Sequence, residues 1–327
     1  MNGNVRRSTH THLYYTMKDT LSVIIPVYNR ESLVIRTLDS VYAQSWRPIE
    51  LIVVDNNSTD NSRTVVEDWA RQHADQNFKI NILEEKTPGA CAARQTGFEA
   101  ATSDVVAFFD SDDTMHPDLA KTAMQDFLRD PDLDIVCWRV SYGADTPGGQ
   151  RPYKRFSQRN PLRRHLLNGM LSTQAYAVKA NYFRRYGGWD PTLPIWNDWE
   201  LGLRLLLGNP PISFHPETRA TVYPQVQSIT GQNHVSRIKQ FEAALNKMRQ
   251  VSLNQPEPLR SRLMSLLLYR SVNLAALYKR EGNPEAATEL LRHSLETTDE
   301  PAWRKVLLRL IYAYTSLGGR CAYLLWH

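Results

Sequence analysis

The sequence lacks the continuous stretch of about 18 apolar residues that a membrane-spanning helix needs. Residues 1–19 also lack the apolar segment of a secretory signal. Hydrophobic residues nevertheless make up 42% of the 327 residues, enough to form a large core. We therefore expect a cytoplasmic protein with one large and one smaller domain.

Cysteine is scarce: the sequence has three, Cys91, Cys137 and Cys321, and they lie far apart. This number and spacing indicate reduced thiols and argue against a disulfide framework or a cysteine-rich metal site. The segment PVYNRES (26–32) lacks glycine and lysine, which disfavours a nucleotidyltransferase, because such an enzyme needs a glycine-rich basic loop there. No nucleic-acid-binding motif accompanies the basic residues, so no nucleic-acid partner is expected.

Charge is unevenly distributed along the chain. Residues 237–327 contain 14 Lys and Arg against 8 Asp and Glu, whereas the preceding residues contain 25 against 26. Residues 146–189 contain nine basic residues and no acidic ones. Both segments predict anionic partners, either phosphates or a lipid surface.

Short apolar segments alternate with amphipathic patterns between residues 21 and 140. The apolar segments predict strands and the amphipathic patterns predict helices. The near-continuous valine and isoleucine of these strands favour an α/β fold with a mostly parallel central sheet, covered on both faces. The predicted strands are 21–27, 49–55, 78–84, 104–110 and 132–140, and the predicted helices are 31–44, 59–72, 89–101 and 116–129.

Amphipathic helical patterns replace the strand signals from about residue 236 onward. One segment, 274–295, resembles a tetratricopeptide helix–turn–helix, but a single copy does not establish a repeat array. We predict an N-terminal extension (1–19), an α/β domain (20–232) and a helical C-terminal domain (233–327).

Three polar segments follow predicted strands: PVYNRE, DNNSTD and DSDD. Ligands bind beyond the carboxyl ends of the strands in such sheets, so these segments form a candidate site. Asp110 and Asp112 have the spacing of ligands to a divalent cation, Mn²⁺ or Mg²⁺, that also binds a diphosphate. The alternative is a solvated loop in which Asp113 or Thr114 caps the next helix.

Other candidates lie beside these segments. Asp55 could accept a hydrogen bond from a nucleoside, or could cap a helix as Ser58 or Thr59 also could. Pro26, Tyr28 and Asn29 could form a wall against a base, or an ordinary turn. Arg94 could reach a diphosphate from its small-residue helix, or could lie on the surface.

The segment GGWDPTLPIWNDWELGLRLLLG (187–208) places Asp198 and Glu200 at a helix start. The helix dipole by itself accounts for carboxylates there. The functional interpretation makes Asp198 a general base and the aromatic rings a wall for a sugar; the predicted acceptor residues are Trp189, Trp196, Trp199 and Glu200.

Taken together, these segments resemble a family 2 glycosyltransferase with the GT-A fold. The resemblance rests on SVIIPVYNRESLVIRTLDSV, IELIVVDNNSTDNS, PGACAARQTGFEAATSDVVAFFDSDDTMHPDLA and YGGWDPTLPIWNDWELGLRLL, in the family's order over about residues 20–230. It implies an inverting transferase in which Asp112 and Asp110 bind the metal and Asp198 is the base. The residues implied for nucleotide and donor binding are Pro26, Tyr28, Asn29, Glu31, Asp55, Arg94, Asp110, Ser111 and Asp113.

Two departures from the family pattern stand out. Asn197 replaces the usual Glu before the base, and Pro224 and Gln225 replace the usual Arg and His, although Ser228 and Thr230 are retained. The arginine-rich segment 151–164 could supply the missing basic contact, or could be a loop without a catalytic role. A non-catalytic sugar-nucleotide-binding or scaffold protein is therefore the alternative function.

The resemblance implies a nucleoside-diphosphate sugar donor, with a UDP-sugar as the default, and a glycan or polyprenyl-linked acceptor in surface polysaccharide biosynthesis. The basic segment 151–185 suits a phosphate-bearing acceptor or an acidic oligosaccharide equally. The tail 303–327 combines basic and aromatic residues without an acid. It predicts either a helix that contacts an anionic membrane or a helix packed on the helical domain.

Overall fold

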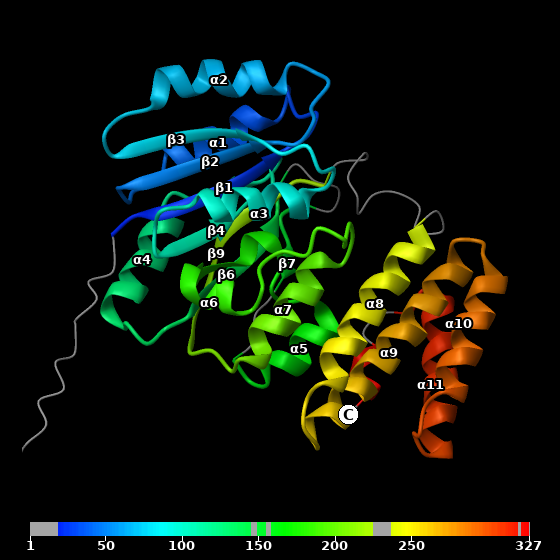
Figure 1. Cartoon of the computed structure of the whole chain (residues 1–327). Coiled ribbons are helices and arrows are strands. Elements are labelled where there is room, and N and C mark those ends of the chain that lie inside the picture. The colour runs from blue at the N-terminus through cyan, green and yellow to red at the C-terminus, as the bar shows by residue number, and fades with distance from the viewer. Residues whose placement is uncertain (1–18, 145–148, 155–157, 225–236, 320–321, 327) are drawn as a thin grey trace, which may run out of the picture.

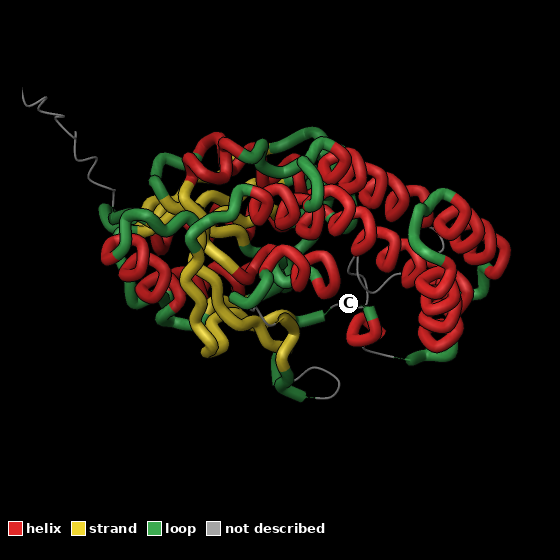
Figure 2. Tube along the Cα trace, turned by 90° about the horizontal axis from the view of Figure 1, so that it is seen from below, coloured by secondary structure: helices red, strands yellow, loops and turns green. Residues whose placement is uncertain are grey.

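The computed structural model describes residues 19–144, 149–154, 158–224, 237–319 and 322–326. It confirms the α/β class, with a sheet at one end of the molecule and a group of helices at the other (Figures 1 and 2). Within these residues nine strands form one sheet in the order β3-β2-β1-β4-β8-β6-β9-β5, with β7 paired to β6.

The first four strands pair in parallel, as predicted: β1 (Leu21–Val27), β2 (Ile49–Asp55), β3 (Phe78–Glu84) and β4 (Val105–Phe108). Every residue of β1, β2 and β4 is buried, because helices cover both faces of this part of the sheet. Its helices are α1 (Val34–Tyr42), α2 (Ser62–His73) and α3 (Ala90–Ala100). A Cβ added at Gly97 of α3 would lie 2.5 Å from Ile24 Cγ2, so this glycine permits the close contact of α3 with β1.

The other half of the sheet is mixed. There β6 (Ile135–Tyr142) is parallel to β9 (Ile212–Val222), whereas β8 (Tyr176–Lys179) is antiparallel to both β4 and β6. The short β7 (Pro152–Lys154) pairs antiparallel with β6. Strand β8 therefore interrupts the parallel pairing after β4, while β6 and β9 run in the same direction as β4.

The segment after Asp113 differs from the prediction. Thr114–Met115 forms a strand, β5, paired with Thr221 and Ala220 of β9, and α4 (Leu119–Arg129) starts only after it. Asp118 is the N-cap of α4, so Asp113 and Thr114 do not cap this helix. The pairing partner lies about a hundred residues away in the chain, which explains why local patterns do not reveal β5.

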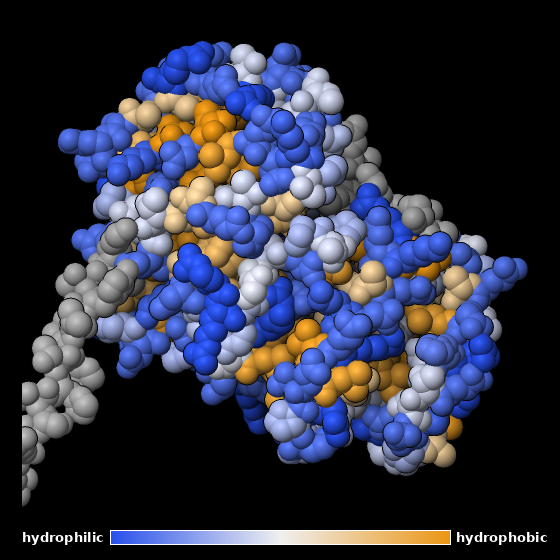
Figure 3. All heavy atoms as spheres, viewed as in Figure 1, coloured by the Kyte–Doolittle hydropathy of each residue, from blue (hydrophilic) through white to orange (hydrophobic). Residues whose placement is uncertain are grey.

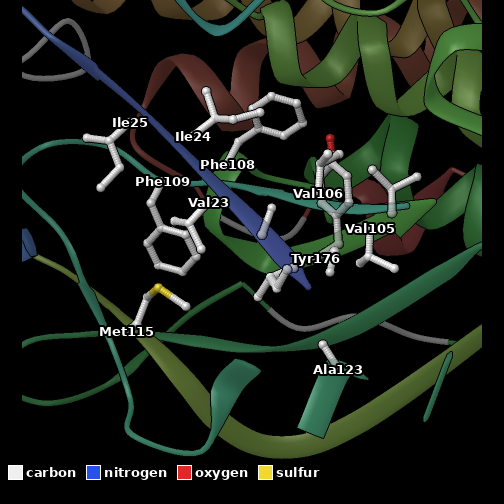
Figure 4. Packing of buried hydrophobic residues seen from close by; sticks show 14 of the residues in the cluster. Val23, Ile24, Ile25, Val105, Val106, Phe108, Phe109, Met115, Ala123 and Tyr176 are labelled. Carbon is white, nitrogen blue, oxygen red and sulfur yellow. The ribbon is translucent and has the colours of Figure 1, made fainter. Parts of the chain in front are cut away.

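Figure 4 shows part of the core around β1 and β4, where Phe108 lies close to Ile24 and Phe109 lies near Met115. All four side chains are buried. The apolar segment that leads to the aspartates is therefore anchored in the core.

The remaining helices lie between β7 and the end of the described chain. Between β7 and β9 they are α5 (Pro161–Asn168), the 3-10 turn η1 (Thr173–Ala175), α6 (Ala180–Arg185) and α7 (Asn197–Leu207). The C-terminal ones are α8 (Ile238–Leu253), α9 (Leu259–Arg280), α10 (Pro284–Glu296), α11 (Ala302–Ser316) and the 3-10 turn η4 (Ala322–Leu325). In the part of the chain that the structure describes, none of them is long and apolar enough to cross a membrane.

A second apolar cluster unites these C-terminal helices with α5 and α7, through Leu166, Leu167 and Leu203. Hydrophilic residues dominate the visible surfaces of α2 and α10 in Figure 3, and apolar residues show mainly between elements. The predicted domain boundary at residue 232 and the extension 1–18 fall outside the described residues. The shared cluster means that the C-terminal helices support the elements around Asp198.

Candidate active site

Asp110, Asp112 and Asp113, the carboxylate cluster, follow β4 at the carboxyl end of the parallel strands. Asp110 is held from two sides. One oxygen forms an ion pair with Arg94 of α3, and the other accepts a hydrogen bond from Gln174 Nε2 at 2.6 Å. Two of the predicted donor-site residues, Asp110 and Arg94, are thus in direct contact.

Asp113 is almost completely buried below Asp110. Its Oδ1 accepts a hydrogen bond from the backbone N–H of Tyr223 at 3.0 Å, and its Oδ2 accepts one from Gln174. Burial, together with the charges of Asp110 and Asp112, raises the pKa of Asp113 well above the usual value for aspartate. The Gln174 amide therefore bridges two carboxylates that repel each other.

Asp112 is mostly buried: 15% of its side chain is exposed, against 33% for Asp110. Burial and the charge of Asp110 raise its pKa to about 6, while Arg30, whose Nε lies 3.5 Å from Asp112 Oδ2, lowers it. Arg36 donates a hydrogen bond to the Asp112 carbonyl at 2.7 Å and stacks 3.8 Å above the Tyr223 ring. These contacts connect the cluster to α1 and to the end of β9.

Burial is the main cause of the raised pKa values of Asp112 and Asp113, and the charges of the neighbouring aspartates add to it. Among the described residues, no three His, Cys, Asp or Glu side chains form a complete metal cage. Two aspartates with phosphate oxygens as the remaining ligands are a usual donor set for Mg²⁺ or Mn²⁺. The residues present fit an ion that binds together with a diphosphate.

Asp55 ends β2 on the same edge of the sheet. Its Oδ2 accepts a weak hydrogen bond from the Ser58 N–H at 3.4 Å, whereas its buried Oδ1 has no hydrogen-bond partner among the described residues. The next helix, α2, has Asn61 at its N-cap, so none of Asp55, Ser58 and Thr59 caps it. An unsatisfied buried acceptor can bind a ligand hydroxyl or N–H.

Only part of the wall predicted after β1, from Pro26, Tyr28 and Asn29, is accessible to a nucleotide base. Tyr28 is exposed, but Pro26 is buried within β1, in register with Val54. Asn29 accepts a hydrogen bond from the Thr59 N–H at 2.8 Å, and Glu31 accepts one from the Asn61 N–H at 2.9 Å. Tyr28 is therefore the residue of this group whose ring is open to a ligand, while Asn29 and Glu31 join two loops.

Arg94 is buried between the cluster and the start of α7. Its guanidinium carbon lies 4.7 Å from the centre of the Trp189 ring. Burial lowers the pKa of Arg94, but the charges of Asp110, Cys91 and Asp198 outweigh this effect and raise it. The charges of Asp110 and Asp198 therefore both favour the charged form of the same guanidinium.

The start of α7 is tightly constrained. Trp196, with φ of 52°, precedes the helix, and Asp198 lies in its first turn. The Trp199 indole donates to the His165 carbonyl at 2.7 Å, and Arg270 of α9 stacks 3.4 Å from its ring centre. Burial lowers the pKa of Arg270 to about 9. Trp196 and Trp199 are partly exposed beside Asp198, and both rings also pack against the C-terminal apolar cluster.

Two of the predicted acceptor residues do not reach this surface. The Glu200 carboxylate is fully buried, and both of its oxygens accept hydrogen bonds from Arg204 at 2.7 Å. Trp189 is also buried and packs its ring edge-to-face against Phe108. These side chains support the site from within, because the core and an ion pair already occupy them.

The basic contact expected from segment 151–164 is not found at the cluster among the described side chains. Arg151 stacks on Tyr142, and Arg163 donates to the Trp326 carbonyl. Arg30, Arg36 and Arg94 lie at the cluster instead. The predicted residues Ser228 and Thr230, and Gln225, lie outside the described residues.

Sequence reasoning missed Gln174, Arg30, Arg36 and Tyr223. Gln174 lies in a segment without a recognisable motif, and only the antiparallel insertion of β8 brings it to the cluster. Arg30 and Arg36 lie within SVIIPVYNRESLVIRTLDSV, the first of the matching segments. Their positive charge was the sequence feature that could have identified them as site residues.

Comparisons with known proteins agree with this arrangement. Residues 22–187, about half of the chain, match the family model described as glycosyl transferase family 2. The uncharacterized glycosyltransferase YibD of Escherichia coli is 37% identical over 116 residues, 36% of this chain and 32% of that protein. The amylovoran biosynthesis glycosyltransferase AmsB of Erwinia amylovora is 36% identical over 103 residues, 31% and 34% of the two chains. The matched region spans about a third of these relatives.

Solved structures share the fold over most of the chain. Residues 1–349 of Staphylococcus aureus TarS, in complex with UDP-GlcNAc, superpose with a TM-score of 0.68 and 20% identity, covering 93% of this chain and 89% of that one. A mannosyltransferase from Pyrobaculum calidifontis, in complex with GDP-Man and Mn²⁺, gives a TM-score of 0.55 and 22% identity, with 94% and 82% covered. These likenesses confirm the predicted GT-A fold. Together with the match of the family model, they show that the chain belongs to glycosyl transferase family 2.

Proposed function

We propose that this protein is an inverting, metal-dependent glycosyltransferase. It moves a sugar from a nucleoside-diphosphate sugar, by default a UDP-sugar, to a glycan or lipid-linked saccharide in surface polysaccharide biosynthesis. The observation that carries the proposal is the ion pair of Arg94 with the carboxylate cluster, at the carboxyl end of the parallel strands. The relative AmsB, named for amylovoran biosynthesis, supports the polysaccharide context.

The donor nucleotide would lie between Tyr28 and Asp55. The exposed Tyr28 ring offers a stacking surface, and the unsatisfied Asp55 Oδ1 offers an acceptor for a base N–H or a ribose hydroxyl. The fold supports a nucleotide-sugar donor, because solved structures that share it hold UDP-GlcNAc and GDP-Man. The binding preference of this protein determines which base and which sugar its donor carries.

Asp112 and Asp110 would hold the divalent ion, which supplies charge neutralisation for the leaving diphosphate. The Asp110 side chain is 33% exposed and that of Asp112 15% exposed. Burial raises the pKa of Asp112, and the charge of Asp110, which a cation would balance, raises it further. Asp113 and Gln174 fix the cluster from beneath. Arg30 and Arg94 add positive charge beside it.

Asp198 would act as the general base. The acceptor hydroxyl oxygen attacks the anomeric carbon, the bond from that carbon to the diphosphate oxygen breaks, and the hydroxyl proton moves to Asp198. Attack from the side opposite the leaving group inverts the configuration. The first turn of α7 favours the ionised carboxylate, and Trp196 and Trp199 beside it provide surfaces for a sugar ring.

A donor screen tests the proposal. Purified protein is mixed with UDP-, GDP-, dTDP- and CMP-sugars, with and without Mn²⁺ or Mg²⁺, and thermal stability and donor hydrolysis are measured. We expect one nucleotide class to stabilise the protein only when metal is present. Asp112→Ala should abolish this effect, whereas Asp198→Asn should keep donor binding and lose transfer. No response to any donor would favour the scaffold alternative.

The acceptor and the location are further parts of the proposal. A polyprenyl-linked acceptor would place the protein in the cytoplasm at the inner face of the membrane. The partly exposed Trp196 and Trp199 suit a saccharide, and the basic residues between 151 and 185 suit a phosphate on it. Transfer to a lipid-linked and to a water-soluble saccharide, compared by product analysis, separates the two acceptor classes.

A further inference from the structure

Helix α11 is apolar on two opposite faces. Leu308 and Ile311 are buried on the side that packs on α9. The other side carries large apolar side chains at helical spacing, each between 49% and 90% exposed: Trp303, Val306, Leu310, Tyr314 and Leu317. We name these five residues the α11 stripe. Leu324 and Leu325 of the neighbouring η4 are also exposed.

The neighbouring helix α10 provides an internal comparison. It packs on the same helix, α9, but its exposed positions carry polar or charged residues, among them Glu285, Glu289, Arg292 and Glu296. Figure 1 shows both helices at the end of the molecule away from the sheet. Exposed large apolar residues are therefore not a general property of this region, and a contiguous apolar stripe marks an interaction surface.

The charges on α11 indicate what the stripe contacts. The helix contains Arg304, Lys305 and Arg309 and no acidic residue. Arg304 is turned inward and pairs with Glu300 at 2.8 Å, whereas Arg309 is exposed and Lys305 partly exposed on one flank of the stripe. Two copies of α11 facing each other would bring these like charges together. A surface of anionic headgroups would balance them.

We propose that the α11 stripe docks this protein on an anionic lipid bilayer. The leucine and valine side chains enter the interface, Trp303 and Tyr314 lie at headgroup depth, and Lys305 and Arg309 contact lipid phosphates. This docking rests on and extends the proposed function, because a lipid-linked acceptor would lie in the same membrane on which the protein docks. It does not depend on catalysis, since the helix lies outside the candidate active site.

Vesicle flotation of the full-length protein tests the docking without donor or acceptor. We expect flotation with vesicles that contain phosphatidylcholine and phosphatidylglycerol, and little with phosphatidylcholine alone. Leu310→Ser with Leu317→Ser should weaken binding by about tenfold or more, because two exposed apolar anchors are lost. Lys305→Gln with Arg309→Gln should weaken it by about 30-fold and remove the preference for anionic lipid.

The matched control is Lys79→Gln with Lys121→Gln, which makes the same charge change on exposed residues of β3 and α4. This variant should float like the parent, and thermal unfolding should be unchanged in all variants. Absence of flotation with either vesicle, or equal binding by parent and stripe variants, would overturn the docking. A dimer in light scattering that Leu310→Ser abolishes would show a second copy as the occupant instead. Donor hydrolysis measured in parallel reports on the proposed function separately.

Discussion

At the scale of single residues, the carboxylate cluster combines three carboxylates with three guanidinium groups, those of Arg30, Arg36 and Arg94. Asp113 differs from its neighbours because it is buried, and the donors to its carboxylate among the described residues are neutral: the Gln174 amide and the Tyr223 N–H. A carboxylate in this environment destabilises the folded state when ionised. Such a cost is typical of a site kept for function.

Asp113→Asn removes this charge, but it also places an NH2 group where one of the two accepting oxygens now faces a donor. We therefore expect lower transferase activity and a changed pH dependence of stability. The folded pKa of Asp113 lies above the unfolded one, so its contribution to stability falls as the pH rises past the usual aspartate range. From acid to neutral pH the variant should gain about 1 kcal/mol relative to the parent, or about 2–4 °C in Tm. Thermal unfolding of metal-free protein across pH measures this, and a difference that is the same at every pH would contradict it.

The pKa of Asp112, about 6, predicts how donor binding depends on pH. Metal-dependent nucleotide affinity should fall about tenfold for each pH unit below this value, because protonated Asp112 cannot bind the cation. Arg30 lowers the pKa of Asp112, so Arg30→Gln should move the midpoint to higher pH. Calorimetric titration of UDP with Mn²⁺ tests the direction of the shift. Arg63→Gln, at an exposed residue of α2, is the control and should leave the midpoint in place.

At the scale of elements, the first turns of α7 depend on a buried ion pair. Glu200 and Arg204 lie one turn apart, and Arg204 also donates to the Gly188 carbonyl at 2.7 Å and to the Tyr186 carbonyl. The pair therefore fixes the Gly187–Gly188 turn against the helix that carries Asp198. Glu200 supports the base from inside the protein and does not line an acceptor surface.

Removing one partner of this pair should be more harmful than removing both. Arg204→Met leaves the buried Glu200 carboxylate uncompensated and should cost about 3–5 kcal/mol. The double variant Glu200→Gln with Arg204→Met should recover a large part of that loss, because no buried charge remains. Urea unfolding gives the three free energies. Equal stability of the single and double variants would show that the pair does not carry this role.

At the scale of the whole molecule, the helical C-terminal region joins the candidate active site. Arg270 of α9 stacks on Trp199 and donates to the Leu167 carbonyl at 3.3 Å, and Leu203 of α7 belongs to the C-terminal apolar cluster. The helices after residue 237 therefore position the residues beside Asp198.

Arg270→Leu should change acceptor use more than donor use. Loss of the stacked guanidinium should cost about 1–2 kcal/mol of stability and loosen Trp196 and Trp199. We expect the acceptor KM to rise several-fold while the KM for the nucleotide sugar stays constant, in steady-state assays with each substrate varied. Arg280→Leu, at an exposed end of the same helix, is the control. A higher donor KM alone would contradict this coupling.

Much of the fold was predictable from local patterns. The strands 21–27, 49–55 and 78–84 match β1, β2 and β3. Strands β1 and β2 are buried along their whole length and are rich in apolar residues, whereas β3, at the edge of the sheet, alternates apolar and polar residues. Helix ends were less accurate: helix 31–44 forms only over Val34–Tyr42. The tail prediction offered membrane contact or packing on the protein, and α11 packs one face and exposes the other.

The positions of β1, β2 and β3 along the chain, and the aspartates that follow β4, were predictable because strand propensity and a polar rim are local properties. Three other features became apparent only in the folded protein: the antiparallel entry of β8, the bridge that Gln174 forms between Asp110 and Asp113, and the burial of Glu200. These outcomes depend on contacts between residues far apart in the chain. Their energies come from burial and charge pairing in the assembled core, which no single segment of the sequence contains.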